Sequence, residues 1–180
     1  MKALLIVDVQ NDFLTGGSLA VENAEQVIPI INKLMDSFNL ILATKDWHPA
    51  ESDHFKRWPI HCISGSKGSE FHPDLHYRKI DQIFYKGTGN KDDGYSAFEA
   101  TNISLLQFLK ERRVTKLYIC GIALEFCVKS SALDALKGGI NVFLNRDAIA
   151  TFSKDLKEID REYAEIKKYG ATIVSSRQIV

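Results

Sequence analysis

The sequence has no excess of charge of either sign, because Lys and Arg together number 23 and Asp and Glu together also number 23 in its 180 residues. Proteins that bind nucleic acid or an anionic membrane surface commonly carry a clustered excess of positive charge. We therefore expect no nucleic-acid partner and no membrane partner. A small, weakly charged molecule fits this composition better.

Long apolar runs are also missing. No uncharged stretch approaches the roughly 20 apolar residues that a membrane-spanning helix needs. The apolar start, Ala3 to Val7, is stopped by Asp8 and is not followed by the small-residue cleavage site of a secretory signal. We expect a cytoplasmic protein.

Cysteine is scarce, and the three that occur are Cys62, Cys120 and Cys127. An odd number in a chain of this length argues against a disulfide framework and for reduced thiols. Cys120 lies in an apolar run and is expected in the core, and Cys62 is expected to pack. Cys127 is the candidate for a reactive thiol.

Short apolar runs alternate with helix-like segments along the whole chain. The runs predict strands at 2–7, 40–44, 83–86, 116–120, 140–144 and 171–174. Helical spacing of apolar residues predicts helices at 27–38, 103–112, 126–137 and 157–168. Asn23 and Gln26 resemble a capping box before the first helix, in which Pro29 predicts a kink or a later start.

This alternation predicts an α/β fold in which a mostly parallel sheet has helices on both faces. The length fits a single domain over residues 1–180. Active sites of such sheets lie at the carboxyl ends of the strands. Asp8, Asp46, His48 and Cys127 all follow such ends, and the glycine-rich stretch 65–94 is expected to form active-site loops.

A group of metal-ligand residues lies within sixteen positions: Asp46, His48, His54 and His61. Carboxylate and neutral imidazole are the ligands that divalent first-row metals prefer. No cysteine pair accompanies them, which excludes a zinc finger. The simpler interpretation is a polar loop, and these residues alone leave both open.

A second group combines a thiol, an acid and a base. Cys127 is expected at a helix N-terminus, where the helix dipole favours the thiolate. Asp8 closes an apolar strand and needs a partner, for which Lys86 is the candidate. Such a set can transfer an acyl group, although a core cysteine, a capping acid and a solvated lysine are the alternatives.

Six ordered blocks stand out along the chain: DVQNDF at 8–13, DWHP at 46–49, WPIHC at 58–62, YKGT at 85–88, YSAF at 95–98 and GIALEFCV at 121–128. In this order they resemble the nicotinamidases (pyrazinamidase-like) of the isochorismatase-like cysteine hydrolase family, and the resemblance spans residues 2 to roughly 150. The resemblance implies a six-stranded parallel sheet in a three-layer sandwich. It also implies hydrolysis of nicotinamide, the expected partner, to nicotinate and ammonia through a thioester.

The resemblance assigns roles residue by residue. Cys127 matches the nucleophile, Asp8 the base and Lys86 the cation that holds the two. Asp46, His48 and His61 match the ligands of one divalent metal that grips the ring nitrogen. His54 matches a further ligand found in only part of the family. Zinc is the metal that we expect, and iron and manganese are the alternatives.

Binding roles follow in the same way. The amides of Ala123 and Cys127 match the oxyanion donors, with a cis peptide bond expected between Ile122 and Ala123. The remaining matches are to residues around the ring of the substrate, and they are Phe13, Trp58 and Tyr95.

The chain departs from the family at two places. Leu124 stands where many members have threonine, and the short segment between His48 and His61 suggests an open pocket that also accepts pyrazinamide. A related hydrolase of ureido or carbamoyl compounds is one alternative, and a non-catalytic metal-binding domain is another. The sequence leaves open whether the protein forms a homo-oligomer.

Overall fold

The apolar runs of the sequence form one sheet, and the computed structural model describes residues 1–179. The sheet has six strands in the order β3-β2-β1-β4-β5-β6, and all its pairs are parallel. The strands are β1 (Lys2–Val7), β2 (Ile41–Asp46), β3 (Gln82–Lys86), β4 (Lys116–Gly121), β5 (Asn141–Ile149) and β6 (Thr172–Val174).

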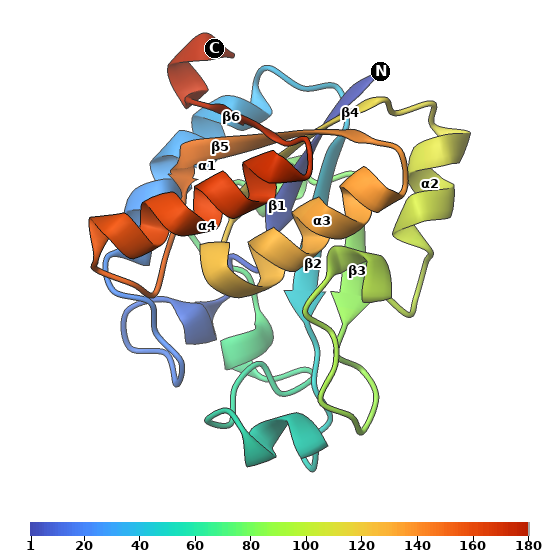
Figure 1. The fold of residues 1–180 in the computed structure, drawn as a ribbon. Coiled ribbons are helices and arrows are strands. Elements are labelled where there is room, and N and C mark those ends of the chain that lie inside the picture. Colours follow the sequence, from blue (N-terminus) through green and yellow to red (C-terminus); the bar gives the residue numbers. More distant parts are fainter. Residues whose placement is uncertain (180) are drawn as a thin grey trace.

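Helices cover both faces of this sheet, so the predicted three-layer α/β fold is confirmed (Figure 1). The helices are α1 (Val27–Met35), α2 (Leu105–Glu111), α3 (Lys129–Lys137) and α4 (Leu156–Lys168). One core layer joins α2, α3 and α4 to the sheet, with Leu5 and Leu117 among its strand residues. The other layer joins α1 to the opposite face through residues such as Leu4 and Ile6.

Alternate residues of β1 thus point into two different cores. Leu4 and Ile6 face one layer, and Ala3, Leu5 and Val7 face the other. A strand that is buried on both faces has no polar side to alternate with, which explains the continuous apolar run KALLIV. The polar residue Asp8 comes only where the strand has ended.

The topology places a crevice at the carboxyl ends of β1 and β4. The chain adds β2 and β3 on one side of β1, then crosses over to place β4, β5 and β6 on the other side. Ligands of open α/β sheets bind at such a reversal of strand order. Asp8 directly follows β1, and Cys127 comes six residues after the end of β4. Both candidate residues therefore lie at this crevice.

Some predicted boundaries are corrected by the structure. The predicted capping box is wrong, because Asn23 has a left-handed φ of 59° and makes no side-chain capping bond. The helix α1 begins at Val27, as predicted, but ends at Met35 and not at residue 38. Pro29 lies in its first turn, where the missing amide hydrogen is tolerated. Asp46 is the last residue of β2 and does not follow it. Within residues 1–179, no helix has both the length and the apolar character to cross a membrane.

Candidate active site

Asp8, Lys86 and Cys127 meet at the carboxyl ends of three strands, and we call them the triad. The Lys86 Nζ atom lies 2.8 Å from Asp8 Oδ2 and donates to Cys127 Sγ at 3.4 Å. The side chains of Asp8 and Lys86 are fully buried, while Cys127 is 9% exposed and lines a pocket. The structure therefore brings together the thiol, acid and base that the sequence placed about 120 positions apart.

The lysine has a second carboxylate partner. Its Nζ atom also donates to Asp46 Oδ1 and, at 2.8 Å, to the carbonyl oxygen of Gly94. Burial lowers the pKa of Lys86, but the Asp46 and Asp8 carboxylates outweigh it and hold that pKa well above its usual range. Lys86 is thus a fixed cation that joins the triad to the metal-ligand residue Asp46.

Burial sets the protonation of the other two triad members. Burial raises the pKa of Asp8, and the Lys86 ammonium opposes that rise. Burial also raises the pKa of the Cys127 thiol, with Lys86 opposing and Asp8 and Asp46 adding to the rise. These shifts oppose the predicted preference for the thiolate, because burial and the two carboxylates raise the pKa of the thiol while Lys86 and the helix dipole lower it. The thiol of Cys127 therefore lies beside a carboxylate whose pKa is also raised by burial.

Cys127 is held by a short π-helix, η7 (Leu124–Val128), which runs directly into α3. Single π turns inside helices are frequent at functional sites. Before η7 the chain passes close to β1 at Gly121, where a Cβ atom would lie 2.1 Å from the carbonyl oxygen of Val7. Only glycine fits there, and this close approach brings Cys127 beside Asp8.

The peptide bond between Ile122 and Ala123 is cis, as the resemblance implied. Within residues 1–179, nothing accepts a hydrogen bond from the N–H of Ala123. Ala123 and Cys127 line the same pocket, so their amides lie near the thiol. Leu124 is buried and donates its N–H to the carbonyl oxygen of Ala150 at 2.9 Å, so it serves the core and not the pocket.

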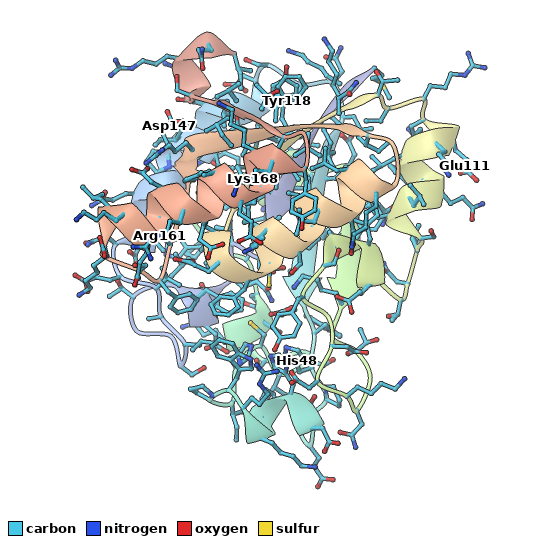
Figure 2. All side chains as sticks on the ribbon, in the orientation of Figure 1. His48, Glu111, Tyr118, Asp147, Arg161 and Lys168 are labelled. Carbon is cyan, nitrogen blue, oxygen red and sulfur yellow. The ribbon has the colours of Figure 1, made fainter. Side chains whose placement is uncertain are left out.

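The three histidines gather beside the triad and form what we call the histidine cluster (His48, His54 and His61). One ring nitrogen of each lies within 4.8 Å of the corresponding atoms of the other two. Figure 2 shows His48 among the loops beyond the strand ends, far from Tyr118 at the opposite end of the sheet. The carboxylate Oδ2 of Asp46 lies 3.7 Å from His48 Nε2 and 3.8 Å from His61 Nε2.

Each ring of the cluster is oriented through its Nδ1 atom. That atom lies 2.9 Å from the Gly87 carbonyl oxygen for His48 and 2.7 Å from the Pro59 carbonyl oxygen for His61. For His54 the neighbour is the Asp92 carboxylate, at 2.8 Å. Because these oxygens only accept, Nδ1 carries the proton and Nε2 presents its lone pair.

The cluster fits a divalent metal. His48 Nε2 is fully buried and has no hydrogen-bond partner among the described residues, which is costly unless an ion binds it. Burial lowers the pKa values of His61 and His54, which keeps these imidazoles neutral. Burial raises the pKa of Asp46, but Lys86 and His48 outweigh it and hold that carboxylate ionised. One carboxylate and three neutral imidazoles suit zinc, iron or manganese.

A pocket opens between the triad and the histidine cluster. The predicted substrate residues Phe13, Trp58 and Tyr95 all line it, as do Asp46, His54 and His61. Sequence reasoning missed further apolar walls from separate segments of the chain: Leu19, Ile122, Phe126 and Phe152. Trp58 and Phe126 meet edge to face with ring centroids 4.9 Å apart, which makes one aromatic wall continuous.

Two polar residues that sequence reasoning also missed brace the strand ends. Thr44 Oγ1 donates to Asp8 Oδ1 at 2.7 Å and accepts from the Asp8 N–H at 3.2 Å. The Gln10 side chain donates to the carbonyl oxygen of Asp46 at 2.9 Å and accepts from its N–H at 2.8 Å. Thr44 was visible as a polar residue closing an apolar run, which was the available signal.

Comparison with known proteins agrees with this geometry. A profile described as the isochorismatase domain matches residues 2–178. The chain belongs to the isochorismatase family. Its parallel sheet with the thiol after β4 is therefore the isochorismatase fold.

Relatives of this isochorismatase-family chain match it over nearly their full length. The nicotinamidase of Acinetobacter baylyi is 38% identical and the match covers 99% of this chain and 94% of that protein. The structure of PnC1 from L. infantum in complex with nicotinate has a TM-score of 0.93 at 35% identity, covering 100% of this chain and 95% of the other. The pyrazinamidase of Pyrococcus horikoshii in complex with zinc has a TM-score of 0.87 at 38% identity, covering 97% and 98%.

Proposed function

We propose that the protein hydrolyses nicotinamide to nicotinate and ammonia with the help of a divalent metal. The observation that carries this proposal is the pocket, in which Cys127 and the histidine cluster flank a space walled by Phe13 and Trp58. A flat ring with a carboxamide on one side and a ring nitrogen on the other matches those three features. The nicotinamidase and pyrazinamidase relatives support this substrate class.

In the first half of the proposed reaction, the thiol of Cys127 gives its proton to Asp8. The sulfur bonds to the carboxamide carbon, and the amides of Ala123 and Cys127 hold the oxyanion that forms. The carbon–nitrogen bond then breaks, and the leaving nitrogen takes the proton from Asp8 as ammonia. Lys86 stays charged throughout and keeps Asp8 and the sulfur in place.

In the second half, Asp8 accepts a proton from a water molecule that attacks the thioester. The carbon–sulfur bond breaks, Cys127 recovers its proton, and nicotinate leaves. The raised pKa of Asp8 suits both halves, because proton transfer is most efficient when the base has a pKa closer to the working pH.

The residues proposed to hold the metal are Asp46, His48, His61 and His54. When bound there, the ion supplies a Lewis-acidic point that orients the ring nitrogen of the substrate. Phe13 and Trp58 stack on the ring, and Tyr95 closes its edge. Pyrazinamide keeps the carboxamide and the ring nitrogen of nicotinamide and adds a second ring nitrogen, so we propose it as a second substrate.

We propose zinc as the metal, since the Pyrococcus horikoshii relative was solved with it. Residues 1–180 are proposed to act as one catalytic domain, which the family match over residues 2–178 supports. A cytoplasmic location and the absence of nucleic-acid and membrane partners are proposed from the zero net charge and the unpaired thiols.

Ammonia release from purified, zinc-loaded protein tests this function directly. Nicotinamide is expected to be turned over, and a Cys127→Ala variant is expected to lose about 10⁴- to 10⁶-fold in kcat, as enzymes do when the nucleophile is removed. Turnover of carbamoyl amines but not of nicotinamide would contradict the proposed substrate. An undiminished rate in the Cys127→Ala variant would contradict the proposed nucleophile.

A further inference from the structure

We propose that Asp92 is a positioning residue that holds His54 in the histidine cluster and ties it to the aromatic wall of the pocket. Asp92 lies outside the six sequence blocks of the family resemblance, in the loop between β3 and Tyr95. The inference rests on the proposed function only where it concerns substrate, since the metal part stands on the geometry alone.

Both oxygens of the Asp92 carboxylate are occupied. Oδ1 lies 2.8 Å from His54 Nδ1 and accepts from the Tyr95 hydroxyl at 2.9 Å. Oδ2 accepts from Arg57 Nη1 at 2.8 Å. One side chain therefore receives three donors, from His54, Arg57 and Tyr95, although Asp92 itself is exposed.

The contact with His54 decides which nitrogen of that ring faces the metal cluster. A carboxylate at Nδ1 holds the proton on that atom and stops rotation of the ring, so Nε2 is left to act as the ligand. His48 and His61 obtain the same orientation from backbone carbonyls of Gly87 and Pro59. Of the three, His54 is the one oriented by a side chain, so truncation of that side chain removes its orienting contact directly.

The contact with Tyr95 extends this control into the pocket. Trp58 Nε1 donates to the Tyr95 hydroxyl at 2.9 Å, and that hydroxyl donates to Asp92. A continuous chain of hydrogen bonds thus runs from Trp58 through Tyr95 and Asp92 to His54. Trp58, Tyr95 and His54 all line the pocket, so Asp92 fixes one metal ligand and two substrate walls together.

Arg57 has a smaller part in this arrangement. Its side chain is 67% exposed, and exposed ion pairs contribute little. It balances the charge of Asp92 without being needed for the orientation of His54. We therefore expect substitution of Arg57 to matter far less than substitution of Asp92.

Zinc affinity, measured by competition with a chromogenic chelator, tests the metal part without any substrate. Asp92→Ala is expected to weaken zinc binding about 10- to 100-fold, the usual cost of losing a partner that orients a metal-ligating histidine. Asp93→Ala is the matched control, because this neighbouring carboxylate takes no part in the three contacts and is expected to leave affinity unchanged. Thermal unfolding of the metal-free variants reports whether the fold is preserved.

A double-substitution cycle separates positioning from general loosening. In a His54→Ala background, Asp92→Ala is expected to cause no further loss of zinc affinity, because its ligand is already gone. Asp92→Asn keeps a side-chain oxygen that can accept from Nδ1, so it is expected to recover most of the affinity. With cobalt in place of zinc, the visible spectrum of Asp92→Ala is expected to match that of His54→Ala.

The substrate part has a different readout. In the His54→Ala background, Asp92→Ala is still expected to raise KM for nicotinamide several-fold, because Tyr95 and Trp58 lose their anchor. The positioning role would be overturned if Asp92→Ala bound zinc as tightly as the unsubstituted protein. It would also be overturned if Asp92→Ala lowered zinc affinity further in the His54→Ala background. If nicotinamide is not turned over at all while Asp92→Ala weakens zinc binding, the proposed function fails and the positioning role stands.

Discussion

The triad and the histidine cluster share one pocket but are fixed in different ways. Asp8, Lys86 and Cys127 stand at or just beyond the ends of β1, β3 and β4, where two buried core layers hold the backbone. The histidines lie beyond the strand ends, with His54 in a short 3-10 helix (Asp53–Lys56), and each ring is oriented by one hydrogen bond at Nδ1. The sheet topology thus positions the residues of the triad, whereas individual hydrogen bonds position the rings of the histidine cluster.

This difference predicts separable effects. Changes in the triad should alter bond breaking and leave metal affinity intact. Changes at the contacts that orient the histidines should alter metal affinity and leave the triad intact. Lys86 contacts both sides, through Asp8 and Asp46, so its substitution cannot separate the two effects.

The largest effect in this set is expected from Asp8→Asn, which removes the base but keeps the shape of the side chain. Loss of a general base typically costs about 10²- to 10⁴-fold in rate. Zinc affinity is expected to stay unchanged, because Lys86 keeps its bond to Asp46. Parallel measurement of kcat for nicotinamide and of zinc affinity checks this. If Asp8→Asn lowers both by a similar factor, the triad and the histidine cluster are not separable.

Gly87→Ala is the converse test, aimed at the cluster. Gly87 has a φ of +64°, and an added Cβ would lie 2.4 Å from His48 Cε1. The left-handed backbone costs about 1–2 kcal/mol for alanine, and the clash displaces the His48 ring. We expect zinc affinity to fall about tenfold or more, by analogy with the loss of a contact that orients a ligand.

Gly89→Ala provides the control for that test, because nothing lies within 4 Å of a Cβ at this position. Its zinc affinity and unfolding temperature are expected to match those of the unsubstituted protein. Equal zinc affinity in Gly87→Ala would show that the histidine cluster tolerates movement of His48.

The smallest effect concerns pH. Thr44 Oγ1 donates to the charged Asp8 carboxylate, which lowers the pKa that burial raises. Thr44→Val removes that donor, so the pKa of Asp8 rises further. Because catalysis needs Asp8 deprotonated, activity disappears as pH falls through this pKa, and the acid limb of kcat/KM is expected to move to higher pH. An acid limb that stays in place would assign it to another group.

The sequence alone predicted the sheet well because the central strands β1 and β2 are buried on both faces and read as short apolar runs. Its errors lie at the ends of elements, where polar residues such as Asp46 still belong to the strand. The capping box at Asn23 failed because the backbone there adopts a left-handed turn that no side-chain pattern required.

The candidate site was predicted through its sequence blocks, and the structure brings those residues together. The burial of the Cys127 thiol and its nearness to two carboxylates, which raise its pKa, could not be read from the sequence because they are properties of the fold. Asp92 could not be predicted, since its contact with His54 joins positions 38 apart in a loop without a periodic pattern. Phe152 was missed because an apolar residue in a loop gives no directional signal, and Phe126 because the π turn of η7 that aims it at the pocket has no sequence pattern.

The central claim is that the pocket needs both the triad and a metal in the histidine cluster. Ammonia release from nicotinamide, measured before chelation, after chelation and after zinc is returned, tests it most directly. We expect chelation to lower the rate about 100-fold or more, in line with the several kcal/mol that a metal contributes, and we expect zinc to restore it. A fully chelated protein that releases ammonia at an undiminished rate would contradict the account.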